Sequence, residues 1–285
     1  MAAMDQRRLT LSDVPACESI ALEHSWEVGE DRWRLMLGQG DGWGCFAPDG
    51  GLVGTTFLFS YEARVALVAM VLVRKSAGRQ GIGRRLVERA MSGSPAVIYL
   101  YATPQGRGLY ERMGFVAGED LARFTGNPKA APVDRAAQLR PLEPEDLPAA
   151  IALDAQAFGA SRSAVIAALR GCAVRALGAW NDGHLVGSGI ATRVGQHVML
   201  GPVSAVEERV GVQLVDALAQ GHPLAVRLDA PARRLALRDW ALRAGLAQEP
   251  SVPLMVLGGR ALPGRRERMM AVARRSAGAS NRADL

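Results

Sequence analysis

The sequence predicts an α/β fold with a mixed sheet, present as two tandem copies. Two observations carry this prediction. In residues 68–91 a short apolar segment, a Gly-rich turn and an amphipathic segment follow one another, and residues of the first half recur in the second half at a constant spacing. With 285 residues, the chain is long enough for two domains of ordinary size.

Residues 68–91 predict a buried strand, a tight turn and a helix. Val68–Val73 is entirely apolar and is followed by Arg74, which suits a strand covered on both faces. The next segment carries apolar residues at helical spacing, namely Ile82, Leu86, Val87 and Ala90. The helix opens on Gly81 and Gly83, where accessible backbone N–H groups and the positive end of the helix dipole favour a phosphate. The alternative is that these glycines only make the turn.

The remaining elements of the first half follow from turn residues and from helical or alternating apolar patterns. Strands are expected at 7–9, 43–47, 52–59, 97–101 and 114–124, and helices at 13–24, 30–37 and 109–113. The Pro-containing segment 127–137 reads as a linker. We therefore divide the chain into a first domain (1–126), the linker (127–137), a second domain (138–261) and a tail (262–285).

An internal repeat supports the tandem arrangement. Five residues of the first half recur 133 positions later: Arg7, Leu9, Asp13, Pro15 and Ala16 are matched by Arg140, Leu142, Asp146, Pro148 and Ala149. At the same offset the sequence DGGLVG at 49–54 is matched by DGHLVG at 182–187. A shared offset in two separated places indicates two copies of one fold.

Composition excludes several other classes of protein. No apolar run approaches the roughly 20 residues that span a bilayer, and the N-terminus lacks the apolar core of a signal peptide, so a soluble cytoplasmic protein is expected. Three scattered cysteines and four histidines show no metal-ligand spacing, so no metal is implied. The net charge is +6, but residues 262–285 hold six basic and two acidic side chains and thus +4 of it. A disordered basic tail is expected there, and nucleic acid is disfavoured as a partner because no aromatic residues interleave the basic ones.

The first half resembles the GCN5-related N-acetyltransferase (GNAT) superfamily. That family has a pyrophosphate loop [Q/R]-x-x-G-x-[G/A] after its fourth strand and a later L-Y-x-x-x-G-F motif. The corresponding segments here are G78-R-Q-G-I-G83 and L109-Y-E-R-M-G-F115. The resemblance covers roughly residues 5–125. It implies acetyl-CoA, or another acyl-CoA, as donor, and a sheet that splays beside the fourth strand to admit the pantetheine arm.

Two positions depart from the family pattern. Gly78 stands where the family has Gln or Arg, so phosphate anchoring by a side chain would shift to Arg79, Arg84 or Arg85. Thr103 stands where many members have Asn, and it either replaces one hydrogen bond to the pantetheine or simply ends the strand. The residues expected to bind the donor are Met70, Val71, Leu72, Val73, Gly78, Arg79, Gln80, Gly81, Ile82, Gly83, Arg84 and Thr103.

For catalysis, the strand backbone at Met70–Val73 is expected to supply N–H groups to the thioester carbonyl. The resemblance places Tyr110 as the acid that protonates the CoA thiolate, whereas the alternative is that it only packs under its helix. No carboxylate lies in residues 65–73, so no general base is assigned. The weak candidates are Glu23, His24, Glu27 and Glu62, and a chain of waters is the alternative.

Three tryptophans, Trp26, Trp33 and Trp43, are candidates for an acceptor pocket, although core packing is the stronger interpretation for each. The second half lacks a Gly-rich turn, carries Glu207 and Glu208 near the corresponding place, and has Ala241 in place of Tyr110. It is therefore expected to have lost donor binding and either to shape the acceptor site or to act as a scaffold. Asp229 is a further weak candidate for contact with an amine.

These observations predict an N-acetyltransferase that moves an acetyl group from acetyl-CoA to a primary amine of a small molecule. The alternative from another class is a non-catalytic acyl-CoA-binding or sensor protein, which the missing base would explain. No membrane partner is expected, and a homodimer stays open. The acceptor and the acyl-chain length do not follow from the sequence.

Overall fold

The computed structural model describes residues 4–26 and 28–273. The first half contains β1 (Asp5–Arg8), η1 (Leu11–Asp13), α1 (Val14–Glu23), α2 (Glu30–Gln39), β2 (Asp41–Phe46), β3 (Leu52–Tyr61), β4 (Val65–Val73), η2 (Lys75–Ala77), α3 (Ile82–Met91), β5 (Val97–Tyr101), α4 (Pro104–Arg112) and β6 (Phe115–Gly126). The second half contains β7 (Gln138–Pro141), η3 (Pro144–Asp146), α5 (Leu147–Phe158), α6 (Ser163–Gly171), β8 (Ala173–Asn181), β9 (His184–Val194), β10 (His197–Ala205), α7 (Glu208–Ala219), β11 (Ala225–Pro231), α8 (Leu235–Arg243), β12 (Ala247–Leu257), η4 (Arg266–Arg268) and β13 (Met269–Ala271).

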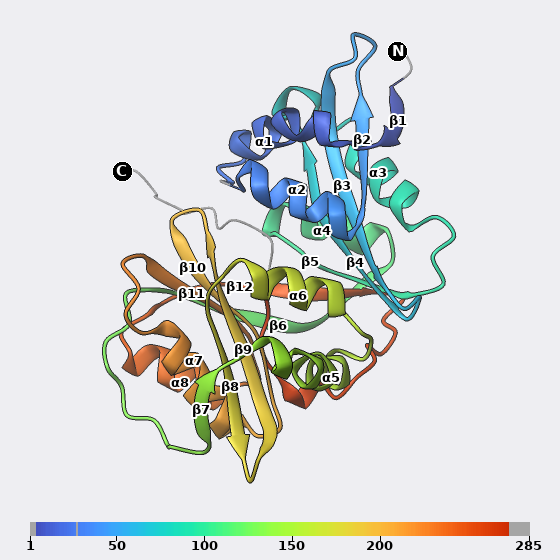
Figure 1. The fold of residues 1–285 in the computed structure, drawn as a ribbon. Helices are drawn as coiled ribbons and strands as arrows, with labels where there is room; N and C mark the ends of the chain where they lie inside the picture. Colours follow the sequence, from blue (N-terminus) through green and yellow to red (C-terminus); the bar gives the residue numbers. More distant parts are fainter. Residues whose placement is uncertain (1–3, 27, 274–285) are drawn as a thin grey trace.

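The two halves repeat one order of elements, which confirms the predicted mixed α/β fold (Figure 1). The shared residues of the repeat make the same contact twice. The Arg7 guanidinium donates two hydrogen bonds to Asp13, at 2.8 and 2.9 Å, and Arg140 does the same to Asp146, at 2.6 and 2.9 Å. Each pair ties the first strand of its half to the turn before the first long helix.

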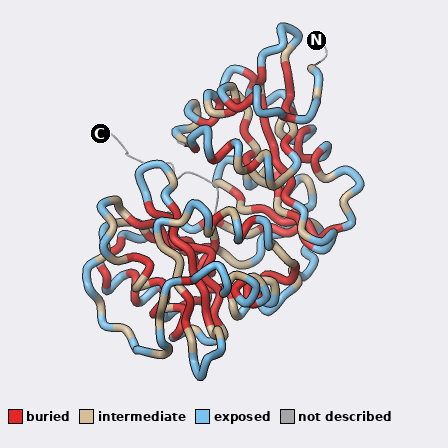
Figure 2. The backbone as a smooth tube through the Cα atoms, viewed as in Figure 1, coloured by how far each residue is buried: buried red, intermediate tan, exposed pale blue. Residues whose placement is uncertain are grey.

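Helix α3 forms where the apolar spacing predicts it. Gly81 precedes it in the left-handed conformation with φ of +73°, which a glycine adopts without strain. Its buried residues are the four predicted ones, Ile82, Leu86, Val87 and Ala90. They pack on the face of β2–β4 opposite to α1 and α2, so the first-half sheet is covered on both sides, as Figure 2 shows by the buried strands at its centre.

The two halves exchange their last strands, which the repeat alone does not predict. The strand order is β1-β2-β3-β4-β5-β12-β6-β11-β10-β9-β8-β7, with β13 paired to β10. Strand β12 of the second half pairs antiparallel with β5 of the first, and β6 of the first half pairs antiparallel with β11 of the second. Strands β6 and β12 also pair with each other, so one sheet runs through both halves.

The tail from residue 262 begins with ordered structure, which corrects the expected disorder for its described part. Met270 is fully buried and Ala271 is 2% exposed, because β13 lies in the second-half core beside β10. Residues 274–285 lie outside the described part of the chain. Among the residues that the structure describes, no helix combines the length and apolar character needed to cross a membrane.

Candidate active site

A cavity of about 900 Å³ opens where strands β4 and β5 separate. The two strands pair in parallel only between Val65–Leu67 and Val97–Tyr99, and beyond this point β4 has no partner on its β5 side. Both halves line the cavity. The second half contributes parts of α5, α6 and β12, together with Met269, Val272 and Ala273.

The structure brings seven of the predicted site residues to this cavity: Met70, Val71, Leu72, Val73, Gly83, Thr103 and Tyr110. The other predicted residues form the loop before α3 and its first turn, and their side chains do not line the cavity: Gly78, Arg79, Gln80, Gly81, Ile82 and Arg84. Since Gly83 lines the cavity and lies between Ile82 and Arg84 in the first turn of α3, the N-terminus of this helix opens at one end of the cavity.

The loop before α3 presents a run of free amides. The backbone N–H groups of residues 79–84 make no hydrogen bond to any described residue, and the first helical amide with a partner is Arg85 N–H, which donates to Gly81 O at 3.1 Å. Arg79 and Gly81 both have positive φ, +61° and +73°. Alternation of this kind curves the chain so that successive amides point to one side, as in anion-binding nests. The loop can therefore hold a phosphate group by its backbone.

Strand β4 carries a bulge at the centre of the cavity wall. Met70 has φ of +54°, and the β3–β4 register shifts beside it. The Thr55 hydroxyl donates a 2.8 Å hydrogen bond to the Met70 carbonyl, which fixes that carbonyl toward β3. The Val73 carbonyl instead lies 2.8 Å from His24 Nε2, on the edge away from β3. The free edge of β4 therefore offers main-chain groups to a ligand.

Thr103 and Tyr110 lie on α4 and its cap. Thr103 Oγ1 accepts a 3.2 Å hydrogen bond from Gly106 N–H and so caps α4. The side chain thus has a structural role at the junction between β5 and α4. Tyr110 is 8% exposed, packs edge-on against Phe115, and no described residue hydrogen-bonds its hydroxyl. Burial raises the pKa of Tyr110 to about 12, so the phenol keeps its proton at neutral pH.

Two loop residues have structural partners of their own. Ile82 is 1% exposed and packs in the core, which leaves only its backbone amide for a ligand. Arg84 Nε donates a 2.7 Å hydrogen bond to Glu88 on the outer face of α3. Arg79 has no ion pair with a described residue and stays the free guanidinium of the loop.

Of the weak candidates for a general base, Glu23 and Glu62 are bonded by other residues, whereas His24 keeps one ring nitrogen as an acceptor at the cavity. Glu23 is bonded by the Arg74 guanidinium and by the Lys75 N–H, and these hydrogen bonds lower its pKa. Glu62 accepts from Ser161 N–H of the second half at 2.9 Å. His24 lines the cavity, and because Val73 O is an acceptor, its Nε2 must donate, which leaves Nδ1 as the acceptor of the neutral ring. Glu27 lies outside the described residues.

Among the tryptophans, only Trp26 lines the cavity. Trp33 is fully buried and donates to Glu18 at 2.7 Å, and Trp43 is stacked by Arg8 and Arg89 on the α3 side of the sheet. Asp229 is fully buried, is bonded at 3.1 Å by Arg227 of its own strand and does not line the cavity, so the structure does not support its contact with an amine.

The second half has neither the loop nor the open slot. Only residues 206–207 separate β10 from α7, where residues 74–81 separate β4 from α3. Strand β13 lies between β10 and β11 and pairs with β10 at Val203–Ser204, while Val272 N–H donates to Asp229 O at 2.9 Å. A Cβ on Gly211 would lie 2.4 Å from Met270 Cγ, so the start of α7 is also filled from this side.

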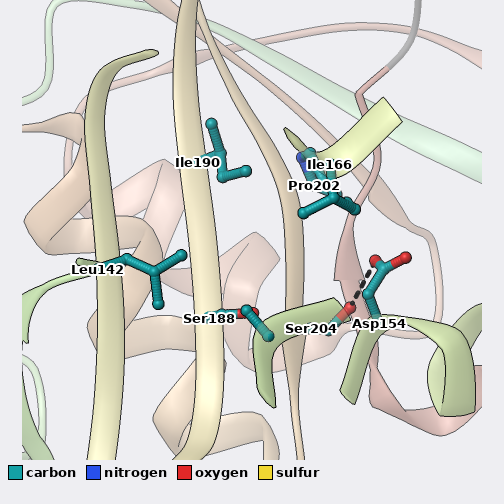
Figure 3. Close-up of a pocket in the computed structure, with 8 residues that line it drawn as sticks. Leu142, Asp154, Ile166, Ser188, Ile190, Pro202 and Ser204 are labelled. Carbon is teal, nitrogen blue, oxygen red and sulfur yellow. Dashed lines mark hydrogen bonds between the residues drawn. The ribbon is translucent and has the colours of Figure 1, made fainter. Parts of the chain in front are cut away.

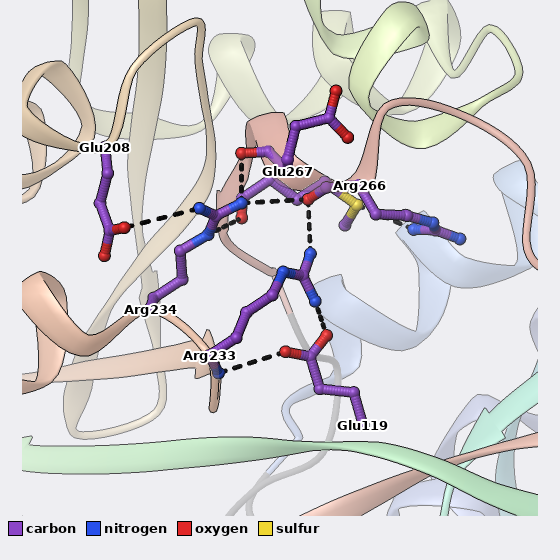
Figure 4. A network of polar contacts seen from close by, with 7 residues as sticks. Glu119, Glu208, Arg233, Arg234, Arg266 and Glu267 are labelled. Atoms are coloured by element: carbon purple, nitrogen blue, oxygen red, sulfur yellow. Dashed lines mark hydrogen bonds and ion pairs between the residues drawn. The ribbon is translucent and has the colours of Figure 1, made fainter.

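An arginine clamp holds this segment in place (Figure 4). The Arg234 guanidinium donates to the carbonyl oxygens of Met269, at 3.1 Å, and of Arg266 and Glu267, and Arg233 donates to Arg266 O at 2.6 Å. The void left between α5 and strands β9 and β10 is only about 10 Å³, and Asp154 reaches across it to Ser204 (Figure 3). That volume is about the space of one water molecule.

The sequence reasoning named a wall of the acceptor site as one of two roles for the second half, but it identified none of the residues of α6 and β12 that line the cavity, and it missed one charged residue of the first half. Arg32 of α2 lines the cavity and is 9% exposed. A helical pattern offered a signal for it, since Arg32 stands four positions before the buried Met36 and so shares its face. The walls from α6 and β12 had no such signal.

Comparison with known proteins agrees with this geometry. Two family models, both described as acetyltransferase (GNAT) domain, match residues 41–117 and 150–271. The uncharacterized N-acetyltransferase YitH of Bacillus subtilis (strain 168) is 27% identical over 235 residues, which cover 80% of this chain and 82% of that protein. A putative acetyltransferase of Pyrococcus horikoshii has a TM-score of 0.80 at 21% identity, over 98% of this chain and 97% of that one.

A tandem GNAT protein from the clavulanic acid biosynthesis pathway has a TM-score of 0.61 at 15% identity, over 91% of this chain and 100% of that one. At such identities the solved structures show a shared fold alone. The two matched domains and the N-acetyltransferase relative show more than a fold. The chain belongs to the GNAT family, as a tandem protein with two GNAT domains, and is a GNAT-type N-acetyltransferase.

Proposed function

We propose that this enzyme moves an acetyl group from acetyl-CoA to a primary amine of a small molecule, and that the chemistry takes place in the first-half cavity. One observation carries the proposal: free loop amides and separated strands occur together in the first half, whereas β13 fills the corresponding place in the second half. A pyrophosphate needs several N–H donors, and a thioester arm needs an open slot beside a strand edge. Family membership favours an enzyme over an acyl-CoA sensor.

The proposed roles follow from position. The amides of residues 79–84 bind the pyrophosphate, and the free edge of β4 after Met70 donates to the thioester oxygen as it gains negative charge. The amine nitrogen forms a bond to the thioester carbon, the C–S bond breaks, and Tyr110 gives its phenolic proton to the departing sulfur. The ammonium proton on the attacking nitrogen passes to water, and the Tyr110 phenolate regains a proton from water, so that the products are the amide and CoA thiol and the enzyme returns to its starting state.

The second half acts as a wall rather than as a second donor site. Its helix α6 and strand β12 line part of the cavity. We place the acceptor against this part of the wall, because the α3 loop at the other end would hold the donor. Its shortened loop carries two carboxylates, Glu207, which is paired with Arg209, and Glu208, which lies 3.7 Å from Arg234. Carboxylates at this place oppose a pyrophosphate.

Calorimetry with acetyl-CoA, and detection of free CoA thiol with a panel of amines, test the proposal. We expect Arg79→Ala to weaken acetyl-CoA binding by about 3- to 10-fold, the effect of an exposed charge contact. The matched control is Arg209→Ala at the start of α7, which should leave the affinity unchanged. An enzyme that does not bind acetyl-CoA, or equal effects of the two substitutions, would contradict donor binding by the first-half loop.

A further inference from the structure

Arg32 is a buried cation without a partner in the cavity wall. Arg32 lines the cavity from α2, a helix that contacts α6 of the second half. The residue is 9% exposed, and its Nε and Nη2 atoms are buried without a hydrogen-bond partner in the part of the chain that the structure describes. Burial lowers the pKa of Arg32, yet a guanidinium keeps its charge in proteins. Within the described residues, this buried positive charge has no carboxylate that neutralises it.

The other two arginines of the cavity wall each have a carboxylate partner. Arg162 makes two hydrogen bonds to Asp154, at 2.8 and 2.7 Å. Arg123 lies 2.7 Å from Glu249 as an ion pair, although its Nε and Nη2 make no hydrogen bond within the described residues. Both carboxylates of the described cavity wall are also engaged, since Glu249 pairs with Arg123 and Glu23 is bonded by Arg74. Among the arginines of the described cavity wall, Arg32 alone has no carboxylate partner, so the partner that it lacks is an anion.

The walls near this charge are largely apolar. The lining includes Trp26 and Phe59 from the first half, and Val165 and Leu169 from α6. Apolar surroundings strengthen an ion pair formed within them and make an unpaired charge costly. Helices α2 and α3 lie on opposite faces of β3, and the N-terminus of α3 carries the proposed phosphate-binding loop. Arg32 on α2 therefore lies on the face away from the donor loop, which we take as the acceptor side.

We propose that Arg32 binds an anionic group, carboxylate or phosphate, of the acceptor. The substrate class is then an amine that carries such an anion together with an apolar segment. The inference rests on the proposed function, because it takes the ligand of Arg32 to be the amine acceptor. Its test measures ligand binding and does not require turnover.

Binding is tested by calorimetry in the presence of saturating free CoA, so that no reaction occurs. The probes are three pairs that differ in the anion: L-phenylalanine and L-phenylalaninamide, 6-aminohexanoate and hexylamine, and O-phosphoethanolamine and ethanolamine. In at least one pair the anionic member should bind about 10- to 100-fold more tightly, the effect of a hydrogen bond to a charged group. The pair that shows the preference distinguishes carboxylate from phosphate.

Two substitutions and one control assign the preference. Arg32→Met should abolish it, and Arg32→Lys should keep part of it. Arg34→Met is the control, since Arg34 lies on the same helix but is exposed and paired with Glu30 at 3.4 Å. Without ligand, Arg32→Met should melt at the wild-type temperature or above it, because it removes an unpaired buried charge.

The inference is overturned if no anionic probe binds better than its neutral partner, if Arg32→Met keeps the preference, or if Arg32→Met melts several degrees below the wild type without ligand. The last result would show that protein contacts already satisfy the guanidinium. Turnover of neutral amines without an anion preference would refute the role of Arg32 and leave the proposed acetyl transfer intact. Selective binding of anions without turnover of any amine sinks the proposed function alone.

Discussion

Replacing Tyr110 by Phe removes one oxygen from the wall of the cavity. The ring should stay in place, because it packs against Phe115 and no described residue hydrogen-bonds the hydroxyl. The free energy of unfolding should therefore change by no more than about 0.5 kcal/mol, as for substitutions that break no contact. Acetyl-CoA affinity should also be kept, since the proposed donor contacts are the loop amides and not the phenol. Any loss of rate then reports on the chemistry.

The size of the loss follows from the role of the proton. Burial raises the pKa of Tyr110 to about 12, which by itself makes the phenol a weaker acid than a free one. The same dry cavity also raises the pKa of a thiol, because it disfavours the thiolate, so acid and leaving group shift in the same direction. General acid catalysis contributes about 100-fold or more, and we expect kcat to fall by at least that factor, or about 2.7 kcal/mol of barrier.

Two measurements separate an acid from a packing residue. With an acyl donor whose leaving thiol is strongly acidic, such as the 4-nitrophenyl thioester of acetate, the rate penalty of Tyr110→Phe should shrink, because that thiolate needs no proton. The wild-type rate should show no decline up to about pH 10, since the buried phenol is still protonated there. Unchanged kcat in the variant, or an equal penalty with both donors, would refute the acid role.

Other predictions concern stability. Met270→Ala should lower the free energy of unfolding by about 2–5 kcal/mol in urea titrations, because the side chain is fully buried in the second-half core. Gly211→Ala should cost about 1–3 kcal/mol in the wild type, where its Cβ would lie 2.4 Å from Met270 Cγ, and little in the Met270→Ala background; additive effects would show that β13 does not fill this place. The pKa of Asp13 is lowered to about 2, mainly by its hydrogen bond from Arg7, so the pair stabilises the fold above the unfolded pKa of the carboxyl and loses this effect as the pH falls toward 2. The stability difference between wild type and Asp13→Asn should shrink from about 1 kcal/mol to nothing over this range, and a constant difference would exclude the linkage.

The local elements of this fold could be predicted because their signals are local. The apolar spacing of α3 and the glycine at its start define both the helix and the loop, and the repeated Arg7–Asp13 and Arg140–Asp146 pairs explain why those residue types recur at one offset. Helix α4 began earlier than predicted, at Pro104, because Thr103 supplies an N-cap that the apolar pattern does not reveal.

The missed features depend on contacts between distant segments. No local pattern in the sequence of β12 indicates that its partners are β5 and β6. This pairing depends on which strand edges remain open when the two halves pack together. Strand β13 was not predicted because the tail was judged by the overall composition of residues 262–285, which is basic. The short apolar run Met269–Ala271 lies within this segment. For Arg32 the helical face could be read from the sequence, but the absence of a partner is a property of the packed cavity.

The strand exchange makes the second half part of the structure around the first-half cavity. Strand β5 forms one wall of the slot at which the cavity opens, and its outer edge is covered by β12, a strand of the other half. Without β12, that edge would be open and β6 would lose one of its two partners. Strand β13 closes the corresponding slot in the second half and lies in the core that supports β11 and β6. The second half thus supports the open slot of the first half through β12, while β13 occupies the corresponding place in the second half and stabilises the strands next to β6.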